Sequence, residues 1–207
     1  MTSREVLVVP SRIERWVENF GTRHGGCTLS VESGALTGTA PDGADFVARP
    51  PFATAYDGPA DAAAFGQTCA PPAHWGVLLV RKGGFAVARL AGERTVESKV
   101  GQRHVQGRTK AGGQSQQRFS RRRDNQARAA YEAAAEHAHR ILTGPLTALV
   151  CGGDRVAVEQ VLEDPRLRRL ETLRVEPWLP VPDPRRSVLE QAVVDGGSVR
   201  VGVTDPA

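Results

Sequence analysis

The chain has 207 residues, a formal net charge of +4 and a hydrophobic fraction of 40%. This length is sufficient to bury a core, so no disulfide or metal is needed to hold the fold. Cys27, Cys69 and Cys151 are isolated and odd in number, which argues against a disulfide framework and against a zinc site and predicts a reducing, cytoplasmic compartment. No apolar run is long enough for a signal peptide or a membrane span, so we expect no membrane contact.

The basic charge is concentrated in one stretch, from residue 99 to residue 123. The stretch contains eight basic residues and no acidic one, and since the whole chain is at +4, the remainder is at −4. The eight residues are Lys99, Arg103, Arg108, Lys110, Arg118, Arg121, Arg122 and Arg123. A local basic stretch of this kind predicts binding to RNA phosphate, and the alternative is a solvated arm.

The N-terminal third of the chain predicts a helix and a strand. Residues 11–20 fit an amphipathic helix in which Ser11 and Glu14 form a capping box. Its apolar face consists of Ile13, Trp16, Val17 and Phe20. Residues 27–31 (CTLSV) fit a strand, whereas the Pro-, Gly- and Asp-rich residues 41–70 predict a loop. We therefore expect residues 1–70 to form an extension that packs on the core of residues 71–207.

Residues 71–207 predict a mixed α/β (α+β) sheet. Three strand-like runs at hairpin spacing, WGVLLV, FAVARL and RTVESKV, indicate an antiparallel meander. Helices are predicted over residues 123–142, 155–162 and 183–194, and further strands over residues 146–151, 173–175 and 199–203. Asp154 is a natural N-cap for the second of these helices. Three antiparallel strands followed by alternating helices and strands are typical of an RNase H-like domain, and we expect residues 71–207 to form one compact unit.

The segment between the third strand and the first long helix contains the candidate catalytic residues. This Gly- and Gln-rich segment has no apolar period and is longer than the connections usual within a compact domain. It contains the tripeptide Gly112-Gly113-Gln114. The tripeptide alone is a weak signal, but here it lies in a long loop, the loop is basic, and the loop follows strand three.

With this context, the chain resembles the middle, catalytic domain of eukaryotic and archaeal class I release factors over about residues 75–203. The segment KAGGQSQQRFSRRRDNQARAAYE is more closely similar to actinobacterial relatives of the quality-control hydrolase that frees nascent chains from stalled large ribosomal subunits. The resemblance implies codon-independent hydrolysis of peptidyl-tRNA by Gly112, Gly113 and Gln114. It also implies the ribosomal large subunit, its RNA and peptidyl-tRNA as partners, with Arg118 and Arg121 to Arg123 seating the loop on RNA.

The chemistry of ester hydrolysis fits these residue types. Two glycines permit positive φ and present no Cβ to the surrounding RNA, so the following residue can approach the ester closely. Gln114 can offer a backbone N–H to the developing oxyanion and a neutral amide that orients water. Arg121 to Arg123 are expected at the start of a helix, where positive charge opposes the helix dipole and favours a bound anion.

Two other functions remain open from the sequence. One is a non-catalytic ribosome- or RNA-binding protein in which the loop only supplies electrostatic attachment. The other is an RNase H-like nuclease, which needs several carboxylates to hold two metal ions, beginning with one on the first strand. WGVLLV contains no carboxylate, and although Glu132 and Asp154 could supply two, helix exposure and N-capping explain them. We therefore expect no metal, no cofactor and no obligate protein partner.

Overall fold

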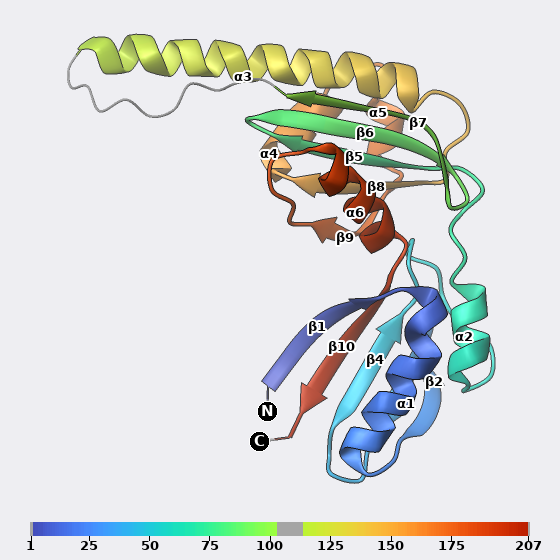
Figure 1. The fold of residues 1–207 in the computed structure, drawn as a ribbon. Coiled ribbons are helices and arrows are strands. Elements are labelled where there is room, and N and C mark those ends of the chain that lie inside the picture. The colour runs from blue at the N-terminus through green and yellow to red at the C-terminus, as the bar shows by residue number, and fades with distance from the viewer. Residues whose placement is uncertain (1, 103–113, 207) are drawn as a thin grey trace. The chain divides into compact units, whose positions relative to one another are not determined.

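The chain forms two compact units in a computed structural model that describes residues 2–102 and 114–206; for Gln102 and residues 114–127 it describes the backbone alone. The first unit contains residues 1–72 and 194–207, and the second contains residues 73–193. Each unit has its own five-stranded sheet (Figure 1). The mixed α and β composition predicted from the sequence is confirmed.

The first unit is an antiparallel sheet with helices on one face. Its strands, in spatial order, are β1 (Thr2–Val8), β10 (Val199–Asp205), β4 (Asp45–Arg49), β3 (Ala35–Thr39) and β2 (Thr28–Glu32). The helices are the short 3-10 helix η1 (Pro10–Arg12), α1 (Ile13–His24) and α2 (Ala62–Thr68). From α1, Ile13, Val17 and Phe20 are buried in the core, as the apolar periodicity predicts.

Three local predictions for this unit differ from the structure. The predicted capping box is wrong, because η1 precedes α1, Arg12 is the N-cap, and no side chain caps the helix. The predicted loop over residues 41–70 is wrong where β4 and α2 lie. The residues of β4 have only a short apolar pattern, and they form a strand because they pair with β3 and β10. Helix α2 is short and alanine-rich, and Asp61 is its N-cap.

The second unit contains a mixed sheet in the order β7-β6-β5-β8-β9. Its strands are β5 (Trp75–Arg81), β6 (Gly84–Ala91), β7 (Arg94–Gln102), β8 (Ala148–Gly153) and β9 (Arg174–Leu179). Strands β5, β6 and β7 form the predicted antiparallel meander, whereas β8 pairs with β5 and β9 pairs with β8 in parallel. The parallel strands require crossovers, and the helices after β7 and β8 supply them.

The helices of the second unit cover both faces of this sheet. Helices α3 (Gln114–Ile141), α4 (Arg155–Leu162) and α5 (Arg168–Glu171) share one hydrophobic core with β5, β6 and β8. Helix α6 (Arg186–Gly196) lies on the other face (Figure 1), where the Arg186 side chain donates a hydrogen bond to Ser98 Oγ at 2.9 Å. Asp154 is the N-cap of α4, as predicted, and accepts hydrogen bonds from Val156 N and Ala157 N.

The last strand is placed differently from the prediction. Residues 199–203 were expected in the domain formed by residues 71–207, whereas β10 lies in the first unit, between β1 and β4. The first unit takes residues 1–72 together with residues 194–207, and it has its own sheet and its own buried core. The pairing of β1 with β10 joins residues that are far apart in the chain. No local sequence pattern encodes such a pairing, so the sequence analysis predicted neither β1 nor the partner of β10.

Along the described ranges, no helix is both long and apolar enough to cross a membrane.

Gly153 gives a test of the junction between β8 and α4. Its φ is +94°, and an added Cβ would lie 2.3 Å from the carbonyl oxygen of Val80. We expect Gly153→Ala to lower the free energy of unfolding by about 2–4 kcal/mol, through backbone strain and overpacking. Gly92→Ala is the matched control, because its φ is +56° and no atom lies within 4 Å of the added Cβ, so it should lose about 1 kcal/mol.

Urea unfolding followed by tryptophan fluorescence would measure both variants. Equal losses for the two would contradict the close packing of Gly153 against Val80.

Candidate functional site

The described candidate residues lie on α3 and β7. Gln114 is the first residue of α3, and Arg118, Arg121, Arg122 and Arg123 follow along the same helix. Lys99 is exposed on β7, opposite Val87 of β6. Gly112, Gly113, Arg103, Arg108 and Lys110 lie outside the described residues.

The predicted start of this helix is wrong. The sequence placed it at residue 123, whereas α3 begins at Gln114. Arg121 to Arg123 therefore lie about two turns inside the helix, beyond the first turn in which the dipole acts on a charge. The expectation that they oppose the helix dipole at the start of a helix is therefore wrong. Apolar periodicity could not reveal this half of α3, because its sequence is polar and has no apolar period.

The C-terminal half of α3 packs on the sheet. At a rise of about 1.5 Å per residue, the 28 residues of α3 span roughly 42 Å, and the N-terminal half extends beyond the strands (Figure 1). The packed half presents mainly alanines, of which Ala130, Ala134, Ala135 and Ala138 are buried, and Ile141 at its end and Leu142 just after it are buried as well. Small side chains allow the helix backbone to approach the sheet closely. This close packing fixes the C-terminal half of α3 on the sheet.

An aromatic contact lies beneath this half of α3. The rings of His137 on α3 and Phe85 on β6 stack with their centroids 5.4 Å apart. Gly101 on β7 faces Phe85, and a Cβ at Gly101 would lie 2.3 Å from that ring. The Phe85 ring therefore occupies space that a side chain at position 101 would fill. Gly101 is the second-last residue of β7, so this contact lies near the end of that strand.

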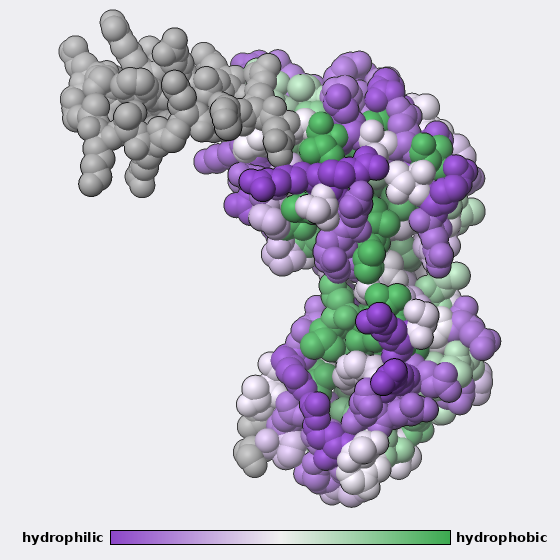
Figure 2. All heavy atoms as spheres, viewed as in Figure 1, coloured by the Kyte–Doolittle hydropathy of each residue, from purple (hydrophilic) through white to green (hydrophobic). Residues whose placement is uncertain are grey.

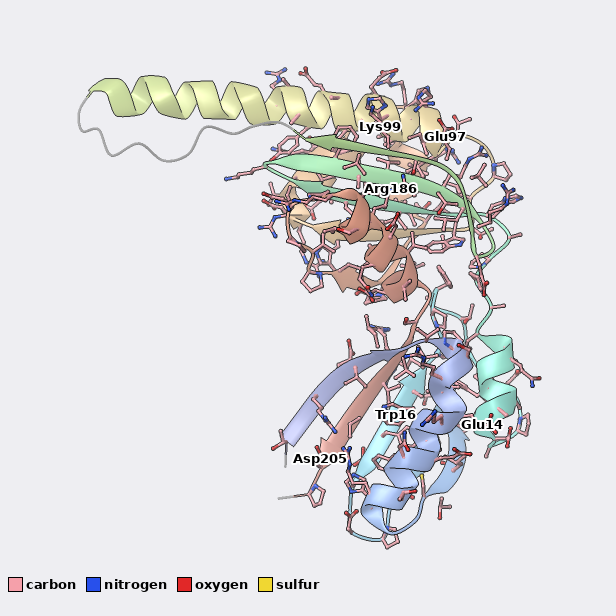
Figure 3. The ribbon with its side chains drawn as sticks, viewed as in Figure 1. Glu14, Trp16, Glu97, Lys99, Arg186 and Asp205 are labelled. Carbon is pink, nitrogen blue, oxygen red and sulfur yellow. The ribbon has the colours of Figure 1, made fainter. Side chains whose placement is uncertain are left out.

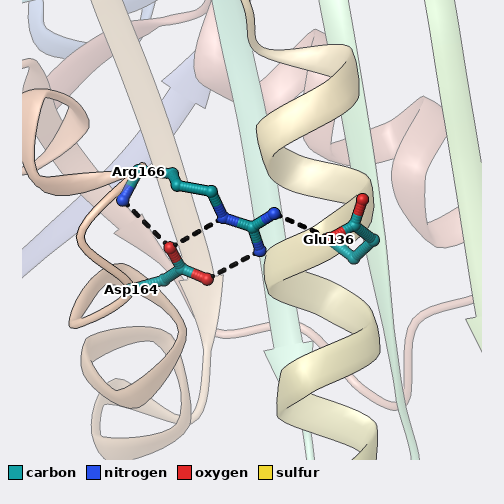
Figure 4. A network of polar contacts seen from close by, with 3 residues as sticks. All are labelled: Glu136, Asp164 and Arg166. Carbon is teal, nitrogen blue, oxygen red and sulfur yellow. Dashed lines mark hydrogen bonds and ion pairs between the residues drawn. The ribbon is translucent and has the colours of Figure 1, made fainter.

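Ion pairs tie the base of α3 to its neighbours. Arg140 of α3 pairs with Glu97 of β7, and Figure 3 shows Glu97 and Lys99 along β7 next to α3. Arg166 donates to Glu136 of α3 at 2.8 Å and binds both carboxylate oxygens of Asp164, at 3.0 and 2.9 Å (Figure 4). Bidentate guanidinium–carboxylate geometry fixes orientation as well as distance. This network joins the turn after α4 to the helix that carries Gln114.

A groove of about 810 Å³ lies between α3 and α4, a size typical of binding sites. Its lining residues are Lys82, Arg128, Tyr131, Glu132, Ala135, Asp154, Val156, Gln160, Glu163 and Asp164. Glu132 and Asp154, the two carboxylates that the nuclease alternative needs, both lie here. Each has another role, because Asp154 caps α4 and Glu132 pairs with Arg128 at 3.3 Å. In the part of the chain that the structure describes, no three His, Cys, Asp or Glu side chains are grouped as metal ligands.

The buried thiols are poor nucleophiles. Burial raises the pKa of Cys69 to about 11 and that of Cys151 to about 12, so both stay protonated at neutral pH. Burial also raises the pKa of the half-buried Cys27. The three cysteines therefore do not supply a reactive thiolate.

Sequence reasoning did not find the groove. Its walls come from α3, α4 and the turn between β5 and β6, which are far apart in the chain. The sequence analysis named two of the lining residues, Glu132 and Asp154, as possible metal ligands, but it did not predict that they border a groove.

Comparison with known proteins identifies the class and then the family. The model of the family described as Actinobacteria/chloroflexi VLRF1 release factor matches residues 73–202, which include the whole of the second unit's sheet. With the mixed sheet and the long helix that begins at Gln114, this match defines a release-factor-like protein of translation. The chain belongs to the Actinobacteria/chloroflexi VLRF1 release factor family. The family resemblance predicted from the sequence is confirmed.

Two solved structures are similar at low identity. The archaeal translation termination factor aRF1 has a TM-score of 0.44 and 16% identity, with 76% of this chain and 48% of that chain covered. This chain thus spans about half of the archaeal factor. The Vms1 mitochondrial localization core has a TM-score of 0.45 and 12% identity, with 92% of this chain and 80% of that chain covered. No curated protein sequence matches the chain.

The Arg166 network predicts a pH-dependent contribution to stability. Hydrogen bonds from Arg166 lower the pKa of Asp164 from 3.8 to about 2. A carboxyl group with a lowered folded-state pKa stabilises the fold fully above its unfolded pKa, and that contribution is lost as the pH falls from about 4 towards 2. We expect Asp164→Asn to lower the free energy of unfolding at neutral pH by about 0.5–1 kcal/mol, the range for partly exposed pairs.

The measurement is urea unfolding of wild type and variant at a series of pH values. The difference between them should shrink below about pH 4. The control variant Asp57→Asn, at an exposed position of the first unit, should keep the wild-type free energy of unfolding at neutral pH. A difference that stays constant down to about pH 2 would contradict the role assigned to Asp164.

Proposed function

We propose that the protein hydrolyses the ester of peptidyl-tRNA, independently of a codon, and so releases nascent chains from stalled ribosomes or large subunits. The observation that carries the proposal is the position of Gln114, which is the first residue of a long helix and belongs to a Gly-Gly-Gln motif in a release-factor family. The RNase H-like description of the sheet and the cytoplasmic location remain predictions from the sequence.

The start of α3 supports an electrostatic role for Gln114. The first backbone N–H groups of a helix have no partner within the helix, and the dipole places partial positive charge at that end. The N–H of Gln114 is one of these groups. Directed at the ester, it would stabilise the developing oxyanion or the leaving ribose oxygen, while the side-chain amide orients the attacking water. The rate then derives from positioning and fixed dipoles rather than from a titrating side chain.

The basic stretch would supply affinity for RNA. Arg118 and Arg121 to Arg123 lie along α3 between Gln114 and the part of the helix that packs on the sheet. In this proposal they contact ribosomal and transfer RNA, together with Lys99, Arg103, Arg108 and Lys110. A helix of this length would carry Gln114 into a narrow RNA cavity while the sheet stays outside it.

Peptide release from isolated large subunits that carry labelled peptidyl-tRNA tests the proposed chemistry. Gln114→Ala removes the side-chain amide but keeps the backbone N–H, so we expect a loss of about 10- to 100-fold in rate. Gly113→Ala adds a Cβ that disfavours positive φ or meets RNA, and it should impair release while binding is largely kept. Gln67→Ala, at an exposed glutamine of α2, is the matched control and should release peptide at the wild-type rate.

Wild-type release rates in both variants would refute the proposed role of the motif. Tight binding by the wild-type protein without any release would instead favour the alternative, a ribosome-binding protein that performs no chemistry.

Ribosome binding at several salt concentrations tests the role of the arginines. Replacement of Arg121, Arg122 and Arg123 by Gln should weaken binding and reduce the slope of log K against log salt by about 2–3. The matched control replaces three exposed arginines of α1 and its N-cap, Arg12, Arg15 and Arg23, and should leave the slope unchanged. If the two triple variants have the same slope as the wild type, the arginines of α3 do not contact phosphate.

A further inference from the structure

The charge of α3 changes sign along its length. From Gln114 to Arg128 the helix has five arginines and one aspartate, whereas from residue 129 to Ile141 it has two glutamates and one arginine. Among the α3 residues whose burial is described, from Arg128 on, the first buried alanine is Ala130. The two halves therefore carry opposite net charge, and the groove between α3 and α4 lies along the half that packs on the sheet.

The groove has more carboxylates than cations. Its lining includes Glu132, Asp154, Glu163 and Asp164 against Lys82 and Arg128, a balance of −2, and Arg166, which pairs with Asp164 beside the groove, brings this balance to −1. The Arg128 and Glu132 side chains are 82% and 68% exposed, so water screens their ion pair and their mutual attraction is weak. A phosphate chain entering this groove would meet net repulsion.

The groove also exposes an apolar side chain. Hydrophilic residues cover much of the face of the second unit seen in Figure 2. The large hydrophobic residues that are exposed in the described ranges are Leu7, Val9, Val96, Val156 and Val194. Val156 is the most exposed of these at 60%, and it lines the groove with Tyr131 and Ala135. An apolar contact surrounded by carboxylates fits a ligand that has an apolar group between positive charges.

We propose that the groove between α3 and α4 docks a basic protein segment, rich in Arg or Lys, that places a small apolar side chain against Val156. Glu132 and Glu163 bind the cations at the two walls, and Tyr131 and Ala135 extend the apolar floor. The α3 residues that line the groove, Arg128 to Ala135, lie about four turns or more along the helix from Gln114. The same helix would thus engage RNA through one half and a cationic protein through the other.

Fluorescence anisotropy with the full-length protein tests this proposal. The probe is a labelled peptide of roughly ten residues that alternates Arg and Lys around a central Leu. The double variant Glu132→Gln/Glu163→Gln should bind it about tenfold more weakly, since each exposed charge contributes ~0.5–1 kcal/mol. The difference should disappear near 1 M salt, where the Debye length is about 3 Å. Val156→Ser should weaken binding at both low and high salt.

The controls separate this site from a general attraction between opposite charges. The matched variant replaces two exposed glutamates outside the groove, Glu18→Gln/Glu93→Gln, and should bind the peptide as the wild type does. A second probe is a labelled single-stranded RNA of about ten nucleotides, whose affinity should be equal or higher in Glu132→Gln/Glu163→Gln.

Three results would overturn the proposal. The first is equal weakening of peptide binding in both double variants, and the second is the lack of saturable peptide binding by the wild type. The third is loss of RNA binding in Lys82→Gln with peptide binding unaffected by Glu132→Gln/Glu163→Gln, which would identify the groove as an RNA site.

Discussion

The close packing of an alanine face of α3 against the sheet is the contact on which the proposed site depends. The N-terminal half of α3 extends past the strands (Figure 1), and the C-terminal half packs on the sheet, where Ala130, Ala134 and Ala138 are buried. Gln114 lies far from the packed half of α3, so a small change in the angle between the helix and the sheet would move it by a large distance. The contact between α3 and the sheet therefore sets the position of Gln114. Larger side chains at the three alanines would move the whole helix away from the sheet.

Polar contacts support this packing from three directions. Glu97 of β7 pairs with Arg140, and Arg166 joins Glu136 to Asp164 after α4. Arg169 donates to the carbonyl oxygens of Leu142 and Gly144, at the end of α3. Exposed pairs contribute little to stability individually. These contacts instead prevent α3 from rotating about its long axis. The alanine side chains that pack on the sheet are too small to prevent this rotation by themselves.

The two halves of α3 differ in charge. The N-terminal half is basic and continues a basic stretch, while the half on the sheet contributes Glu132 to the groove. In the proposed function the basic half binds RNA. The proposed chemistry does not use the acidic groove, and a cationic protein segment is the partner that we propose for it from its charge and its exposed valine.

The sequence by itself determined the family, the meander of β5 to β7, the Asp154 cap of α4 and the buried face of α1. All of these depend on residues close together in the chain, through hairpin spacing, helical periodicity or a local motif. The tertiary structure alone decided that β10 pairs with β1 and β4, that α3 begins at Gln114, and that Glu132 and Glu163 face one groove. These features depend on contacts between distant segments, or on a polar helix without apolar periodicity, and no local pattern encodes them.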